Sequence, residues 1–75
     1  CAPCREIKPY LDEISKDMSD KVDIVRINVD ENQELCRELK IDGIPDLKLF
    51  KNKAVVWSRS GYIEKKEIEK NILAN

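Results

Sequence analysis

The eight residues VDIVRINV, from Val22 to Val29, constrain the fold of this chain more than any other segment. Their β-branched side chains favour a strand, and the run is too short and too apolar for a surface helix. Alternation places Val25, Ile27 and Val29 on one face and Val22 and Ile24 on the other. A strand that is apolar on both faces needs a layer of helices on each side and a neighbouring strand, usually a parallel one. The run therefore predicts an α/β fold with a mixed sheet flanked by helices.

Helical periodicity precedes this strand. Between Pro3 and Met18 the apolar residues recur at helical spacing, at Ile7, Leu11 and Ile14. Pro3 suits the first turn of a helix, where its missing N–H is not needed. Pro9 lies inside the helix, removes one backbone donor and is expected to kink it.

A second, shorter helix is predicted after the strand. Asp30 is a candidate N-cap, and Gln33, three residues later, completes a capping box. Leu35, Cys36 and Leu39 form the apolar side of this helix, where we expect Cys36 to be a small buried thiol. The segment KIDGIP ends it, because Gly43 can adopt a left-handed conformation and Pro45 disfavours a helical residue before it.

The rest of the chain predicts a hairpin and a last helix. Asp46 to Phe50 alternates in polarity, KNK is a turn, and Ala54 to Arg59 returns as an antiparallel strand on which Trp57 is expected to pack. Gly61 ends that strand, and Ile63, Ile68 and Ile72 give a final amphipathic helix. The predicted order is helix, strand, helix, strand, strand, helix.

Composition excludes several classes of function. The net charge of −1 arises from 14 basic and 15 acidic residues mixed along 75 positions, which argues against nucleic-acid binding. No apolar run approaches the roughly 20 residues of a membrane span. Because the chain has no histidine, a Cys/His zinc site and a Cys–His nucleophile pair are excluded.

The segment CAPC places Cys1 and Cys4 on the first turn of the first helix. Unpaired N–H groups and the macrodipole at a helix N-terminus stabilise a thiolate. Cys1, at the more exposed position, is expected to attack a substrate disulfide, and Cys4 to resolve the mixed disulfide. A structural disulfide, or a zinc or iron–sulfur site that includes Cys36, would be the alternative.

These features together resemble the thioredoxin family along the whole chain: CAPC opening a helix that contains Pro9, RINVDEN on a strand, IDGIPDLKLFKN leading a hairpin, and Gly61 before the last helix. The resemblance implies a thioredoxin-like fold of which residues 1–75 form a single domain that lacks the N-terminal strand, helix and central strand. The missing central strand would lie between the strand at 22–29 and the strand at 46–50. We therefore expect a longer protein, or another chain or packing that fills this gap.

The resemblance also implies roles for individual residues. It makes the chain a protein-disulfide reductase with Cys1 and Cys4 as its redox-active disulfide and no further cofactor or metal. Ala2, Pro3, Ile44 and Pro45 would contact the substrate, with the Ile44–Pro45 bond in the cis form and Ile44 offering its backbone to a substrate strand. Gly61 and Arg26 would complete the site.

Three departures from the family pattern bear on function. Asp46 stands where the family commonly has threonine, and its charge could repel acidic substrates. Arg26 stands where the family often has a lysine near a buried acid. Lys53 stands where the hairpin turn usually has glycine. Because Ala2 and Pro3 carry no charge, a reductant is expected rather than an oxidase or isomerase of the same fold. The expected partners are disulfide-containing proteins and an electron donor of the thioredoxin-reductase kind. We expect no binding to nucleic acid or to a membrane. The protein is expected to be a monomer that acts in electron transport and redox homeostasis in the cytoplasm.

Overall fold

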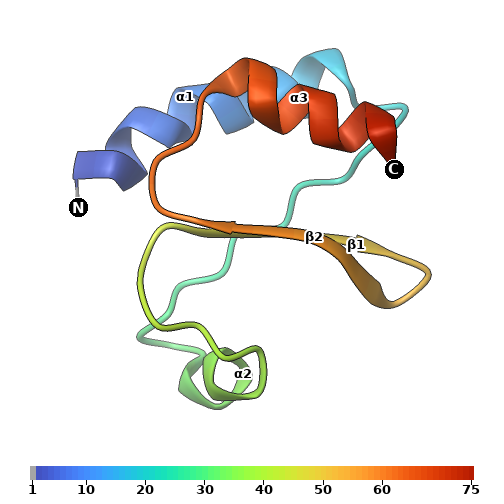
Figure 1. Cartoon of the computed structure of the whole chain (residues 1–75). Helices are drawn as coiled ribbons and strands as arrows, with labels where there is room; N and C mark the ends of the chain where they lie inside the picture. The colour runs from blue at the N-terminus through green and yellow to red at the C-terminus, as the bar shows by residue number, and fades with distance from the viewer. Residues whose placement is uncertain (1) are drawn as a thin grey trace.

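The computed structural model describes residues 2–75. Two helices lie side by side above a β-hairpin, and a short helix lies on the opposite side of it (Figure 1). In chain order the elements are α1 (Ala2–Asp17), α2 (Gln33–Glu38), β1 (Asp46–Lys51), β2 (Ala54–Ser60) and α3 (Lys65–Ala74). The predictions of the first helix, the hairpin and the last helix are confirmed.

The core lies where α1 and α3 meet one face of the hairpin. Its fully or nearly buried side chains are Ile7, Ile14, Met18, Ile63 and Ile68. Trp57 of β2 and Leu47 of β1 pack against this cluster from below, which confirms the packing role predicted for Trp57. The amphipathic pattern of the first helix thus predicts which face is buried, and Pro9 lies on an exposed position of that helix.

The hairpin is antiparallel, with Asp46 opposite Ser60 and Lys51 opposite Ala54. A two-residue turn connects its strands, in which Asn52 and Lys53 both have positive φ angles, of 53° and 69°. This pair of angles is characteristic of the type I′ turn, whose twist matches that of a hairpin. The register shifts between Leu49 and Phe50, which marks a β-bulge.

The predicted strand from Val22 to Val29 is not formed. This segment runs through the described chain without regular secondary structure, and the sheet of residues 2–75 has two strands, β1 and β2. The prediction that both faces of this segment are buried is also wrong, because Val25 is 75% exposed and Ile27 is 48% exposed. Val22 and Ile24 do pack against the core. A strand needs a hydrogen-bonded neighbour, and no strand of the described residues lies beside this segment.

The short helix α2 forms as predicted, but the residues at its start and end differ from those predicted. Asn32, not Asp30, is the N-cap, and its side chain makes no capping hydrogen bond. Asn28 instead organises the preceding turn, because its Oδ1 accepts hydrogen bonds from the backbone N–H groups of Asp30 and Glu31. At the other end Lys40, rather than Gly43, takes the left-handed conformation, with φ 57°. Cys36 is buried, as predicted.

The turn at Asn52 and Lys53 generates a stability prediction. A side chain in the left-handed region costs roughly 1–2 kcal/mol, a penalty that glycine avoids. We expect Lys53→Gly to raise the free energy of unfolding by about 0.5–1 kcal/mol, after the entropic cost of glycine. Denaturant unfolding measures the change. Lys53→Ala removes the same charge but keeps the Cβ atom, so it should give no such gain; equal stabilisation by both variants would contradict this explanation.

Candidate active site

The first turn of α1 carries Cys4, the second thiol of the CAPC segment. Cys4 is partly buried and disulfide-bonded, whereas Cys36 in α2 is a free, buried cysteine. The predicted nucleophile, Cys1, lies outside the described residues. Ala2 and Pro3 precede Cys4 on the same turn, with Ala2 exposed and Pro3 partly buried. A helix N-terminus stabilises negative charge, so this turn is a favourable place for a thiolate.

The loop before β1 provides the second part of the site. The Ile44–Pro45 peptide bond is cis, and Ile44 is 52% exposed. The carbonyl of Pro45 accepts a hydrogen bond of 2.8 Å from the backbone N–H of Gly61. Gly61 has a φ of +87°, a conformation that L side chains rarely adopt. The structure therefore brings together two of the predicted site residues, Pro45 and Gly61, that are far apart in the sequence.

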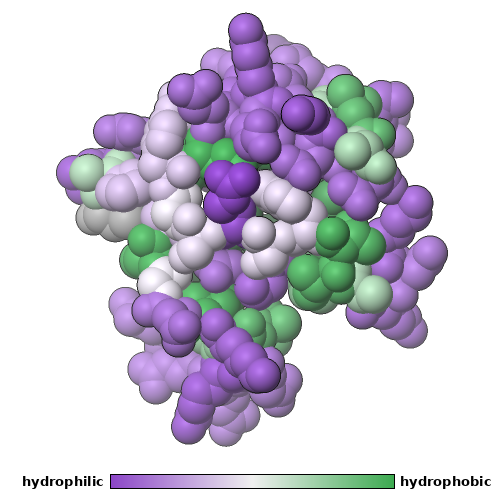
Figure 2. All heavy atoms as spheres, in the orientation of Figure 1, coloured by the Kyte–Doolittle hydropathy of each residue, from purple (hydrophilic) through white to green (hydrophobic). Residues whose placement is uncertain are grey.

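A long groove of about 1070 Å³ connects these parts. Cys4 and Ile7 of α1, Pro45 before β1 and the segment from Val22 to Val29 all contribute to its lining. On the face shown in Figure 2, by contrast, apolar residues are visible only as separate patches between hydrophilic ones. The groove places Cys4 and Pro45 on one continuous surface.

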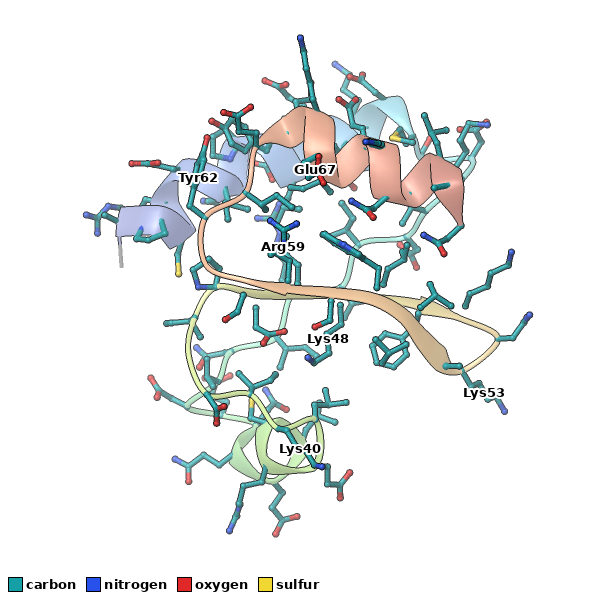
Figure 3. The ribbon with its side chains drawn as sticks, in the orientation of Figure 1. Lys40, Lys48, Lys53, Arg59, Tyr62 and Glu67 are labelled. Atoms are coloured by element: carbon teal, nitrogen blue, oxygen red, sulfur yellow. The ribbon has the colours of Figure 1, made fainter. Side chains whose placement is uncertain are left out.

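Asp46 follows Pro45 and forms an ion pair that sequence reasoning missed. Its Oδ1 lies 3.1 Å from Nζ of Lys48, and the two side chains are only 10% and 15% exposed. Lys48 also donates a hydrogen bond of 3.1 Å to Oγ of Ser58 across the hairpin, on the side of the sheet that faces α2 (Figure 3). Because Asp46 is largely buried and its charge is compensated, it offers little of the repulsion toward acidic substrates that the sequence suggested.

Tyr62, the residue that follows Gly61, forms a pair with Tyr10 of α1. The hydroxyls of Tyr10 and Tyr62 are 2.9 Å apart, and their rings meet edge to face with centroids separated by 6.2 Å. Tyr62 stands beside α1 in Figure 3. The hydrogen bond from Tyr10, then desolvation, then the carboxylates of Glu64 and Glu6 raise the pKa of Tyr62 to about 12. No motif signalled this contact, which joins residues 52 positions apart.

Comparison with known proteins assigns the chain to a family. The chain matches the sequence model of the family described as Thioredoxin over residues 1–74. It belongs to the thioredoxin family.

Individual thioredoxins support the same assignment. The chain is 36% identical to the thioredoxin of Pseudomonas aeruginosa over 75 residues, which cover all of this chain and 69% of that protein. It is 39% identical to the thioredoxin of Bacillus subtilis, over 92% of this chain and 66% of that one. The crystal structure of thioredoxin NaTrxh from Nicotiana alata superimposes with a TM-score of 0.89 at 34% identity and covers 99% of this chain and 63% of that chain. The chain thus has the thioredoxin fold and spans about two thirds of the length of these relatives.

Arg26 lines the same groove as Cys4 and Pro45, and the site role that the thioredoxin resemblance implied for it stays a prediction. Its guanidinium forms an ion pair with Asp12 of α1, and both side chains are about half exposed. Asp12 lies on the exposed side of α1, two turns beyond Cys4. This ion pair links the segment at 22–29 to α1, as the ion pair of Lys65 with Glu13 links α3 to α1.

A metal site and a membrane-spanning helix each set requirements for the part of the chain that the structure describes. Residues 2–75 contain no group of three or more His, Cys, Asp or Glu side chains that could hold a metal ion. None of their helices is both long and apolar enough to cross a membrane.

The tyrosine pair generates a titration prediction. We expect Tyr62 to titrate near pH 12, and Tyr10→Phe to lower its pKa toward the ordinary value of 10.0, because the largest cause of the shift is removed. The phenolate absorbance of Tyr62 in that variant reports one group, since the chain has two tyrosines. A Tyr62 pKa that stayed near 12 in Tyr10→Phe would contradict the assignment of the shift to this hydrogen bond.

The same shift predicts how stability depends on alkaline pH. Folded Tyr62 keeps its proton between pH 10 and about 12, whereas unfolded Tyr62 loses it. Unfolding therefore releases a proton in this window, and the stabilisation that is present below pH 10 should be lost as pH rises toward 12. Denaturant unfolding across this range measures the slope. Tyr62→Phe should flatten it relative to the unmodified chain, and an unchanged slope would exclude Tyr62 as its source.

Proposed function

We propose that this protein is a thiol-disulfide oxidoreductase that reduces protein disulfides. Cys1 is the nucleophile and Cys4 the resolving thiol. The observation that carries the proposal is the position of disulfide-bonded Cys4 at the start of α1, on the same groove as Pro45. Membership of the thioredoxin family supports the same chemistry.

The reaction proceeds by two exchanges. The Cys1 thiolate attacks one sulfur of the substrate disulfide, which forms a mixed disulfide and releases the other substrate sulfur as a thiolate. Cys4, as a thiolate, then attacks the Cys1 sulfur of the mixed disulfide. The second substrate thiolate leaves, and a Cys1–Cys4 disulfide forms. Two electrons pass from the dithiol to the substrate, and the two protons given up by the thiols balance the two substrate thiols that form.

The loop at Pro45 supplies a platform for the substrate backbone. Ile44 is exposed immediately before Pro45, and an extended substrate segment can pair with its backbone as an added strand. Pro45 is held against the end of β2 by the Gly61 hydrogen bond, so this platform is fixed relative to the sheet. Binding there would orient the substrate disulfide toward the first turn of α1.

The proposed direction of electron flow is reduction of the substrate. Ala2 and Pro3, between the two cysteines, add no positive charge that would further stabilise a thiolate and make the dithiol a stronger oxidant. Disulfide-containing proteins are the proposed substrates, and a donor of the thioredoxin-reductase kind would return Cys1 and Cys4 to the reduced state. We propose that the protein acts as a monomer in the cytoplasm.

Trapping of the mixed disulfide tests the two roles. In the intact protein, Cys4→Ser should accumulate a covalent complex with a disulfide-containing substrate such as insulin, because no thiol remains to resolve it. Non-reducing electrophoresis and mass spectrometry identify the complex. Cys1→Ser is the matched variant and should trap nothing. Equal trapping by both variants would show that the assignment of nucleophile and resolving thiol is wrong.

A further inference from the structure

We propose that Tyr62 and Glu6 form a specificity-determining surface beside the first turn of α1, which carries Cys4, and that this surface favours substrate disulfides flanked by an arginine. The inference rests on the proposed function and adds to it a preference among substrates. It is carried by the placement of an exposed aromatic ring, held by two contacts, next to carboxylates at the end of the molecule that contains Cys4.

Tyr62 is held at this end of the molecule by the backbone. It directly follows Gly61, whose N–H is bonded to the carbonyl of Pro45 at 2.8 Å. The left-handed conformation of Gly61 redirects the chain as it leaves β2, and Tyr62 comes to lie beside α1 (Figure 3). The ring is thus one residue away from the contact that holds the Pro45 loop.

The hydroxyl of Tyr10 fixes the ring of Tyr62 on α1. With the hydroxyls 2.9 Å apart and the rings in edge contact, little rotational freedom remains, while Tyr62 stays 42% exposed. A ring that is already ordered loses little side-chain entropy when a partner packs on it. Tyr62 therefore presents a fixed aromatic face to solvent.

Positions 2, 6 and 10 share one face of α1, because residues four apart are neighbours on a helix. Ala2, between the two cysteines, is followed on this face by Glu6 and then by Tyr10. Cys4 lies on another side of the helix, so a substrate that reaches Tyr62 would cross the CAPC turn at Ala2 and extend along Glu6.

The charge on this surface is negative. The carboxylates of Glu6 and Glu64 both act on the Tyr62 phenol, and their side chains are exposed. By helical spacing Lys8 falls on another side of α1, and Arg5, three residues after Ala2, lies at the edge of this face. Glu13, one turn beyond Tyr10, is compensated by Lys65. Glu6 and Glu64 thus remain to attract a cation.

An arginine fits both features of the surface. Its guanidinium stacks on aromatic faces and forms hydrogen-bonded ion pairs with carboxylates. An acidic side chain in the same place would meet two like charges. The surface should therefore discriminate between substrates through binding, before the exchange of disulfides begins.

The inference is tested on the intact protein with three peptide disulfides as substrates. They differ only in the residue next to the reactive cysteine, which is arginine, alanine or glutamate. We expect the KM of the arginine peptide to be lower than that of the glutamate peptide by roughly threefold to thirtyfold, the range of one exposed cation–π contact together with a surface ion pair. The kcat values should be similar. Higher salt should shrink the difference.

Variants separate the ring from the charge. Tyr62→Ala and Glu6→Gln should each narrow the arginine preference, whereas Tyr62→Phe, which keeps the ring, should retain most of it. Glu38→Gln removes an exposed carboxylate from α2, on the other side of the hairpin, and should leave the preference unchanged.

The outcomes distinguish this inference from the function on which it rests. Equal KM values for all three peptides, or a preference that survives both Tyr62→Ala and Glu6→Gln, would overturn the inference and leave the reductase function standing. Failure to reduce any of the peptides or insulin would overturn the proposed function, and the inference would fall with it.

Discussion

The packing of α1 and α3 on one face of the hairpin is the interaction on which the rest of the structure depends. Ile7 and Ile14 from α1 meet Ile63 and Ile68 near α3, and all four are almost completely buried. Full burial of such a side chain contributes about 1.5–3 kcal/mol, which is large against a total stability of about 5–15 kcal/mol. These residues hold α1 over the sheet and so determine where its first turn, with Cys4, is placed.

Two polar contacts then join α1 to the loop at Pro45. The Gly61 N–H bond to Pro45 fixes the loop to the end of β2, and the Tyr10–Tyr62 pair ties the next residue to α1. The backbone N–H of Gly61 donates the first of these bonds, and its left-handed conformation directs the next residue, Tyr62. A thiol on a helix and a loop before a strand are thus held together by the segment that links β2 to α3. This arrangement supports the proposed exchange, in which substrate backbone and substrate disulfide must be held at the same time.

Local patterns predicted the elements that form from short-range interactions. Helical spacing identified α1 and α3, and the polar turn between two alternating runs identified the hairpin. The local pattern wrongly predicted a strand from Val22 to Val29, because strand formation depends on a neighbouring strand and the described chain places none beside this run. The Tyr10–Tyr62 contact and the burial of Asp46 against Lys48 were missed because each follows from the tertiary arrangement, whereas CAPC and the Ile44–Pro45 pair signalled the site directly.

The redox potential of the Cys1–Cys4 couple tests whether this geometry makes a reducing dithiol. Equilibration of the intact protein with glutathione buffers, followed by acid quenching and mass spectrometry, measures the fraction of oxidised protein. A single two-electron transition near the value of about −270 mV typical of thioredoxins is expected, with no contribution from buried Cys36. A potential above about −180 mV, in the range of disulfide isomerases, or a disulfide that involves Cys36, would contradict the proposed reductase.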